Sequence, residues 1–123
     1  MDLNRLATVE QHEAGAECQL HDPQTGKPDD GVIIIQGVDS KAWRDAQKKQ
    51  RRKNKDEDEI DLFDHEYLYP IIAACITGWK NLKKGKEKFE YNEKNALWLC
   101  ENSPTLVTQL FSFVINRENF TGD

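Results

Sequence analysis

Histidine and cysteine, the side chains that most often bind metal ions, are scarce and scattered in this sequence of 123 residues. The histidines, His12, His21 and His65, lie far apart, and the one close pair of possible ligands is Cys18 with His21. A closed tetrahedral site needs about four ligands at suitable spacing, and no second pair completes such a set. The sequence therefore predicts that the chain binds no metal ion.

Catalytic motifs are also missing. Neither G-x-S-x-G nor H-E-x-x-H occurs, no nucleophile motif surrounds the cysteines, and the seven glycines are dispersed and form no phosphate-binding loop. The many acidic residues lie in highly charged stretches, where a carboxylate is most simply solvated. Because catalysis needs converging groups, we expect that the chain is no enzyme and has neither catalytic residues nor a cofactor.

Long apolar runs are absent too. The longest, Val32–Ile35 and Ile71–Ile76, fall far short of the roughly 20 residues that cross a bilayer, and the first residues lack the apolar stretch of a signal peptide. The cysteines are odd in number without a C-x-x-C pair, and Cys75 and Cys100 lie in apolar runs, where a reduced thiol packs as a small hydrophobe. These features predict a cytoplasmic protein without a membrane partner.

Charged residues are plentiful, at 32% of the chain against 37% hydrophobic residues, and the net charge is -5. The apolar residues cluster in the second half, which predicts one folded domain with solvated extensions. We expect residues 1–16 to form a loosely ordered N-terminal tail and residues 17–123 to form the domain.

The domain is expected to begin with a β-hairpin over residues 17–38. The β-branched run Val32–Ile35 is typical of a strand, and the segment before it is dense in turn-forming residues. Residues 40–55 then predict a basic helix, with Ser40 as its N-cap and Trp43 as its main apolar anchor.

Residues 59–123 are expected to form a helical core. The predicted fold class is therefore mainly α (α+β), an N-terminal β-hairpin followed by about four helices. Apolar residues at helical spacing predict the second helix over about 59–77, with a kink or restart at Pro70. Trp79, just beyond the expected end of this helix, is predicted to be a structural anchor.

A connector over residues 80–91 separates this helix from the last two. Gly85 is its expected hinge, and two aromatic residues alternate with charged ones near its end. The third helix is predicted over about 93–101. The fourth is predicted to begin at Ser103-Pro104, because serine as N-cap and proline in the first turn form a strong start signal.

The last two helices carry more apolar side chains than one face of each can bury. Trp98 lies beside Leu97, away from the core-facing side of its helix, and the last helix is apolar over more than half of its circumference. Trp43 anchors an otherwise polar helix that is well placed to reach a neighbouring copy. We predict a partner-binding or self-association surface from these apolar residues: Trp43, Leu97, Trp98, Val107, Phe111 and Ile115.

The basic run Lys48–Lys55 offers a different interpretation, a small nucleic-acid-binding regulatory protein. Acidic residues 56–59 follow the run directly, no aromatic residue lies among its cations, and the net charge is -5. Cations at the end of one helix and anions at the start of the next also suit both helix dipoles. Because phosphate neutralisation supplies most non-specific affinity for nucleic acid, we expect no nucleic-acid partner and keep this function as the alternative.

Several segments, taken in order, match a known pattern. They are Asp22-Pro23-x-Thr25-Gly26, the strand that follows, Asp39-Ser40-x-x-Trp43-Arg44, Ile76-Thr77-Gly78-Trp79 with Leu82, Tyr91-Asn92-Glu93-x-Asn95-Ala96, and the closing Arg117-Glu118-Asn119-Phe120. Over about residues 20–120, this order resembles the tail assembly chaperones of bacteriophages with long, flexible tails. The Gly-Trp pair followed by Tyr-Asn-x-x-Asn is the most distinctive part.

The resemblance implies a non-enzymatic role. Such chaperones bind the long, hydrophobic tape measure protein, keep it soluble in the host cytoplasm and promote polymerisation of the tail tube around it. They help to recruit the tail tube protein, many are also made as a longer frameshifted form, and they self-associate as homo-oligomers in rings or spirals. They are absent from the finished virion. A structural subunit that is retained in the particle is a third interpretation, which presence in purified particles would favour.

Overall fold

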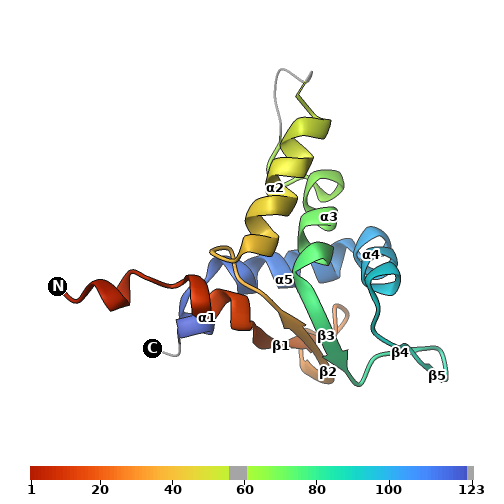
Figure 1. Cartoon of the computed structure of the whole chain (residues 1–123). Coiled ribbons are helices and arrows are strands. Elements are labelled where there is room, and N and C mark those ends of the chain that lie inside the picture. Colours follow the sequence, from red (N-terminus) through yellow and green to blue (C-terminus); the bar gives the residue numbers. More distant parts are fainter. Residues whose placement is uncertain (56–60, 122–123) are drawn as a thin grey trace.

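The computed structural model describes residues 1–55 and 61–121 of the chain. The described residues form six α-helices and a small antiparallel sheet (Figure 1). Along the chain, the elements are η1 (Leu3–Arg5), α1 (Val9–Ala14), β1 (Ala16–His21), β2 (Pro28–Ile35), α2 (Lys41–Lys53), α3 (His65–Cys75), β3 (Ile76–Lys80), β4 (Lys83–Lys84), β5 (Glu87–Lys88), α4 (Glu93–Asn102), α5 (Pro104–Ile115) and α6 (Glu118–Thr121). This confirms the predicted combination of helices with an N-terminal hairpin. The expected number of about four helices is too low, because the short helices α1 and α6 were not foreseen.

The main sheet has the strand order β1-β2-β3, with β2 in the centre and antiparallel to both neighbours. Cys18, Ile33 and Trp79 lie directly opposite one another across the three strands, so their side chains share one face of the sheet. Along β2, the fully buried Ile33 and Ile35 alternate with less buried residues, as expected when one face of a sheet is covered. The predicted hairpin over residues 17–38 is thus confirmed as β1 and β2.

Strand β3 replaces the expected last turn of the second helix. Helix α3 ends at Cys75, and the chain from Ile76 onward pairs with the second edge of β2. At the boundary, the Gln36 N–H donates to the Cys75 carbonyl at 2.9 Å. The β-branched residues Ile76 and Thr77 suit a strand as well as the apolar stripe of a helix, and pairing satisfies backbone groups on β2. Tertiary pairing therefore decides between the two structures.

Pro70 does not divide α3, so the expected restart at this residue is absent. One helix runs from His65 to Cys75 with Pro70 inside it. Proline removes one hydrogen-bond donor, and the carbonyl that loses its partner belongs to Glu66, an exposed residue in the first turn. The expected start of this helix, near residue 59, lies outside the described residues, but residues 61–64 are described and precede the helix, which begins only at His65.

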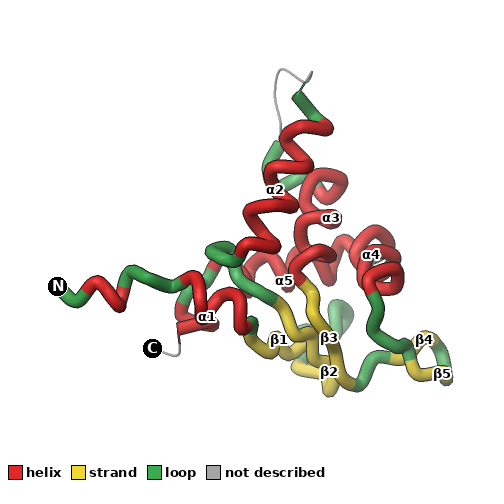
Figure 2. The backbone as a smooth tube through the Cα atoms, viewed as in Figure 1, coloured by secondary structure: helices red, strands yellow, loops and turns green. Residues whose placement is uncertain are grey.

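Helices α2 and α3 lie side by side and rise from the sheet (Figure 2). Ser40 caps α2 as predicted, since its Oγ accepts a hydrogen bond from the Trp43 N–H at 3.2 Å. Farther along α2, the buried Gln50 side chain donates to the Tyr67 carbonyl of α3 at 3.0 Å. An apolar anchor at one end and a buried amide at the other therefore hold α2 against the body of the protein.

Helix α5 completes the core and covers part of an edge of the sheet. Its Leu110 and Val114 are fully buried. The Gln109 side chain pairs with the backbone of His21 in β1: the His21 N–H donates to Oε1, and Nε2 donates to the His21 carbonyl, both at 2.9 Å. Because β1 is an edge strand, this amide occupies backbone groups that a neighbouring strand would otherwise bind.

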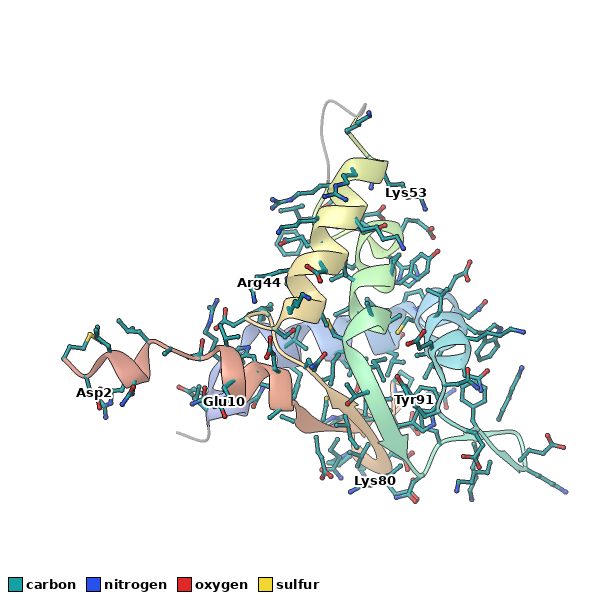
Figure 3. The ribbon with its side chains drawn as sticks, in the orientation of Figure 1. Asp2, Glu10, Arg44, Lys53, Lys80 and Tyr91 are labelled. Atoms are coloured by element: carbon teal, nitrogen blue, oxygen red, sulfur yellow. The ribbon has the colours of Figure 1, made fainter. Side chains whose placement is uncertain are left out.

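The expected loosely ordered tail, residues 1–16, divides into two parts. Residues 1–7, which we call the N-terminal arm, extend away from the body, with Asp2 near the far end (Figure 3). Helix α1 instead lies against the body. Its His12 is completely buried and stacks on Phe120 of α6, with ring centroids 4.7 Å apart. The second part of the expected tail therefore belongs to the packed fold.

Candidate interaction surfaces

The six residues predicted to form an interaction surface separate into exposed and buried groups. Leu97, Trp98 and Ile115 are exposed. Phe111 is half-buried. Trp43 and Val107 are only 7% and 2% exposed, so they lie in the core. The structure therefore removes these two residues from the predicted surface.

Trp43 and Val107 are buried because both turn toward other elements of the same chain. The Trp43 ring stacks on Phe111 of α5, with centroids 6.3 Å apart and an angle of 14° between the planes. Val107 lies on α5 among its buried residues, near Leu110. Helical periodicity shows that α5 has a wide apolar side, but not which part of that side turns inward.

One exposed apolar surface forms where the segment before α3 meets α5. The Phe63 side chain is 74% exposed, and its ring meets Phe111 edge-on with centroids 5.9 Å apart. Ile115 lies one helical turn after Phe111 and is also exposed. We call Phe63, Phe111 and Ile115 the α5 surface. Sequence reasoning missed Phe63, although the pair Leu62-Phe63 stands out within an acidic stretch.

The N-terminal arm carries a second set of exposed apolar side chains. Leu3 is 74% exposed and Leu6 is 60% exposed, although both are large aliphatic residues. The arm has local structure, since the Asp2 carboxylate accepts a hydrogen bond from the Asn4 N–H at 3.0 Å and caps the turn η1. The arm therefore presents two leucines to solvent from an ordered turn.

A third surface contains four packed rings, Trp79, Phe89, Tyr91 and Trp98, which we call the aromatic cluster. Trp79 and Phe89 stack with centroids 5.4 Å apart, Tyr91 meets Trp79 edge-on at 5.1 Å, and Trp98 lies 5.6 Å from Phe89. Trp79 Nε1–H donates to the Phe89 carbonyl at 2.6 Å. The Tyr91 hydroxyl donates to the Ile76 carbonyl at 2.8 Å. These bonds join the aromatic cluster to β3, in keeping with the anchoring role predicted for Trp79.

The aromatic cluster adjoins residues 80–88, which we call the lysine hairpin. Strands β4 and β5 pair here around a two-residue turn that begins with Gly85, at a φ of 66°. The Lys84 ammonium lies 4.1 Å from the centroid of the Trp98 ring, a cation–π contact. The predicted connector with a hinge at Gly85 is thus a short β-hairpin. The segment has five lysines in nine residues, directly before two alternating aromatics.

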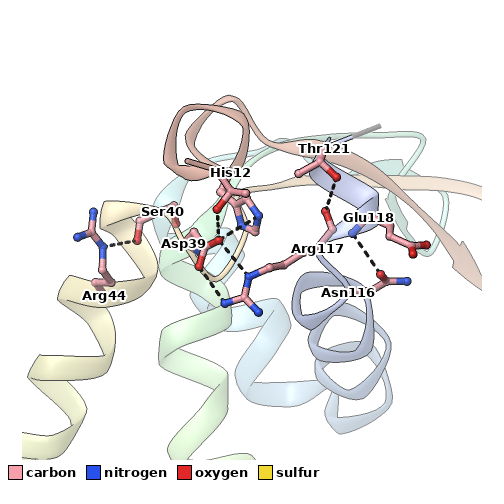
Figure 4. A network of polar contacts seen from close by, with 9 residues as sticks. His12, Asp39, Ser40, Arg44, Asn116, Arg117, Glu118 and Thr121 are labelled. Atoms are coloured by element: carbon pink, nitrogen blue, oxygen red, sulfur yellow. Dashed lines mark hydrogen bonds and ion pairs between the residues drawn. The ribbon is translucent and has the colours of Figure 1, made fainter. Parts of the chain in front are cut away.

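A polar network joins α1, the loop before α2 and the segment before α6 (Figure 4). The Arg117 guanidinium donates two hydrogen bonds of 3.0 Å to the Asp39 carboxylate, and the Thr8 hydroxyl donates to the same carboxylate. The Asp39 N–H donates to His12 Nδ1 at 3.1 Å, and His12 Nε2 lies 3.5 Å from Asp39 Oδ2. A donor directed at Nδ1 fits the neutral imidazole with its proton on Nε2.

The electrostatics of this network favour a structural role. Hydrogen bonds from Arg117 lower the pKa of Asp39 to about 2. Burial lowers the pKa of His12, and this effect exceeds the opposing attraction of Asp39. The Thr8 hydroxyl donates to the carboxylate and not to the imidazole, so His12 does not activate it as a nucleophile. The network therefore holds α1 and the segment before α6 against the loop before α2.

The three cysteines are reduced and buried. Burial raises the pKa of the Cys18 thiol to about 11 and the pKa values of Cys75 and Cys100 to about 12. The thiolate is the reactive form of cysteine, and at these values it is scarce near neutral pH. All three side chains therefore serve as small apolar groups in the core.

Within the part of the chain that the structure describes, no three histidine, cysteine or acidic side chains converge as a metal site would require. None of the described helices combines the length and the apolar character of a membrane span. Comparisons with known proteins found no matching family model, no matching curated protein and no matching solved structure. Functional interpretation of the three surfaces therefore depends on their geometry and on the sequence pattern.

Proposed function

We propose that this chain is a tail assembly chaperone of a bacteriophage with a long, flexible tail. It binds the tape measure protein in the host cytoplasm, keeps that protein soluble and promotes polymerisation of the tail tube around it. The role is non-enzymatic, and the chaperone leaves before the virion is complete. The order of sequence motifs over about residues 20–120 supports the proposal, together with the exposed apolar side chains.

The observation that carries the proposal is the exposure of large apolar side chains on a strongly charged chain. Phe63 and Ile115 on the α5 surface, and Leu3 and Leu6 on the N-terminal arm, all remain in water. A small protein rarely exposes contiguous apolar groups without a use for them. The α5 surface combines two rings with an aliphatic side chain, which suits the apolar stripe of a helical partner. A tape measure protein is expected to be largely helical and apolar.

The N-terminal arm supports self-association. It extends away from the body (Figure 1), so its leucines reach beyond their own fold. A contact between this arm and a different surface of the next copy is heterologous, and repetition of such a contact gives a ring or an open spiral. An oligomer of this kind would align several α5 surfaces along one partner, which raises the effective affinity.

Co-expression with the tape measure protein tests the proposal with two matched variants. Phe63→Ser with Ile115→Ser removes apolar groups from the α5 surface, and Leu3→Ser with Leu6→Ser removes them from the arm. We expect the first variant to lose the soluble tape measure protein, and the second to reduce the concentration-dependent mass measured by light scattering. All four side chains are largely exposed, so neither variant should lose thermal stability.

Two results would contradict the proposal. One is an unmodified protein that stays monomeric at every concentration and fails to keep the tape measure protein soluble. The other is the presence of this chain in purified particles, which would favour a retained structural subunit.

A further inference from the structure

The lysine hairpin is a local positive surface on an acidic protein. Residues 80–88 contain five lysines and one glutamate, whereas the whole chain has a net charge of -5. Lys80 pairs with Glu17 at 2.7 Å, and Lys88 lies 3.6 Å from Glu90. The lysines at positions 83, 84 and 86 are exposed, and no carboxylate of the described residues lies within ion-pair distance of them. These three exposed cations lie within residues 83–86, on β4 and the turn that follows it.

An aromatic platform lies beside these cations. Trp98 is 41% exposed although it packs against Phe89, and the Lys84 ammonium rests over its ring. Next to it lies a cleft of about 320 Å³ with aromatic, aliphatic, amide and charged side chains. It is lined by Trp79, Lys80, Asn81, Leu82, Lys88, Phe89, Glu90 and Tyr91. Exposed rings interleaved with lysines are the arrangement that proteins use to stack bases and hold phosphates.

We propose that the lysine hairpin and the aromatic cluster bind single-stranded nucleic acid, in contrast to the absence of a nucleic-acid partner that the net charge and the run Lys48–Lys55 predict. The Lys83, Lys84 and Lys86 ammonium groups hold backbone phosphates, and one base stacks on Trp98 once Lys84 moves from the ring to a phosphate. The strand is single because in a duplex the faces of each base are covered by its stacked neighbours and are not free to contact the ring. The site is independent of the chaperone role, since it shares no residue with the α5 surface or the arm.

An acidic polypeptide explains fewer of the observations. Carboxylates would pair with the three lysines but would leave the Trp98 ring and the neighbouring cleft without a ligand group. A nucleotide offers both a phosphate and a flat ring. The presence of an aromatic ring beside the cations also distinguishes this surface from the run Lys48–Lys55. On the described part of α2, no cation lies over an aromatic ring, whereas Lys84 lies over Trp98.

The first experiment measures binding of the full chain to fluorescein-labelled oligo(dT) of about 12 nucleotides by anisotropy, with a duplex of the same length beside it. We expect the single strand to bind more tightly than the duplex. Three lysine–phosphate contacts on a single strand give a slope of about -2 in log affinity against log salt, or roughly 15-fold weaker binding between 50 and 200 mM. No binding to oligo(dT) at low salt would overturn the proposal.

Matched variants locate the site. Replacing Lys83, Lys84 and Lys86 by glutamine should abolish both the binding and its salt dependence. Replacing Lys48, Lys49 and Lys53 of α2 by glutamine removes the same charge and should change the affinity less than about twofold. The opposite pattern would assign the binding to α2 and would refute the proposed site.

The role of the Trp98 ring is tested with separate variants. Trp98→Leu should weaken binding at least about fivefold, because a stacked base loses its platform, and Trp98→Phe should restore most of the affinity. Unchanged melting curves would show that the variants remain folded. A poly-glutamate peptide that binds as tightly as oligo(dT), with the same dependence on the three lysines and on Trp98, would identify an acidic polypeptide as the ligand and overturn the assignment to nucleic acid.

Discussion

Arg117 and Asp39 lie 78 residues apart in the sequence and are joined by two hydrogen bonds of 3.0 Å between guanidinium and carboxylate. The Asp39 side chain is 22% exposed and also receives the Thr8 hydroxyl. Because Asp39 directs its own N–H to His12, this one residue links the start of the packed fold to its end.

The first prediction concerns acid stability. Arg117 lowers the pKa of Asp39 from 3.8 to about 2 in the folded chain. A lowered carboxylate pKa stabilises the fold fully above the unfolded value, and the stabilisation is lost as the pH falls from about 4 to 2. Because Arg117 is exposed and its charge is screened by solvent, we expect the pair to contribute about 1–2 kcal/mol to the free energy of unfolding at neutral pH. Asp39→Asn should therefore melt lower than the unmodified protein at pH 7, and the gap should narrow at pH 2. An equal gap at both pH values would contradict this.

The second prediction concerns Gly37. A Cβ at this position would lie 2.1 Å from Nδ1 of the buried His12, whose ring is held from another side by Phe120. We expect Gly37→Ala to destabilise the fold by about 2–3 kcal/mol through overpacking. Gly78→Ala is the control, because its Cβ would meet Ile34 at an ordinary 3.6 Å. Denaturant midpoints measure both, and equal midpoints would count against the packing of α1 on this loop.

The third prediction compares two tryptophans of the aromatic cluster. Trp79 stacks on Phe89, meets Tyr91 edge-on and donates a hydrogen bond, so we expect Trp79→Ala to cost about 3 kcal/mol of unfolding free energy. Trp98→Ala should cost about 1 kcal/mol or less, because much of that ring is already in water. Urea unfolding curves give both values. A larger loss for Trp98 would show that it, and not Trp79, is the anchor.

The fourth prediction concerns the edge of β1. Gln109→Leu removes both hydrogen bonds to the His21 backbone, and we expect a loss of about 1–2 kcal/mol. Hydrogen exchange at the His21 amide should accelerate selectively. Ser112→Ala, an exposed position on the same helix, should leave that exchange rate unchanged. Equal exchange rates in both variants would mean that Gln109 does not protect the edge.

Local chemistry made part of this fold predictable. Ser40 has the side chain of an N-cap and caps α2, and the β-branched run at residues 32–35 forms a strand. β3 could not be predicted in the same way, because the residues after Cys75 also fit the end of a helix. Only their pairing with the edge of β2, a contact distant in sequence, makes them a strand. The burial of His12 depends on Phe120, more than 100 residues later, and no local sequence pattern predicts such a contact.

The candidate surfaces were predictable to a smaller extent. Helical spacing predicts that Trp98 and Ile115 are exposed, and they are. It fails for Trp43, because spacing does not reveal which neighbour covers a ring. The sequence of residues 80–88 predicts only a connector, because the segment has no hydrophobic periodicity that would indicate a strand or a helix.

The contact between His12 and Phe120 also sets an order of events during synthesis. Helix α1 leaves the ribosome before its stacking partner in α6, with all of the main sheet and α2 to α5 between them. Until then, the imidazole lacks its cover and the Asp39 carboxylate lacks the Arg117 guanidinium. The two ends can meet only after the sheet and α2 to α5 have been translated. In a nascent chain halted before residue 117, α1 would therefore lack its contacts with Phe120 and Arg117. The N-terminal arm attached to α1 could then bind other chains throughout the pause.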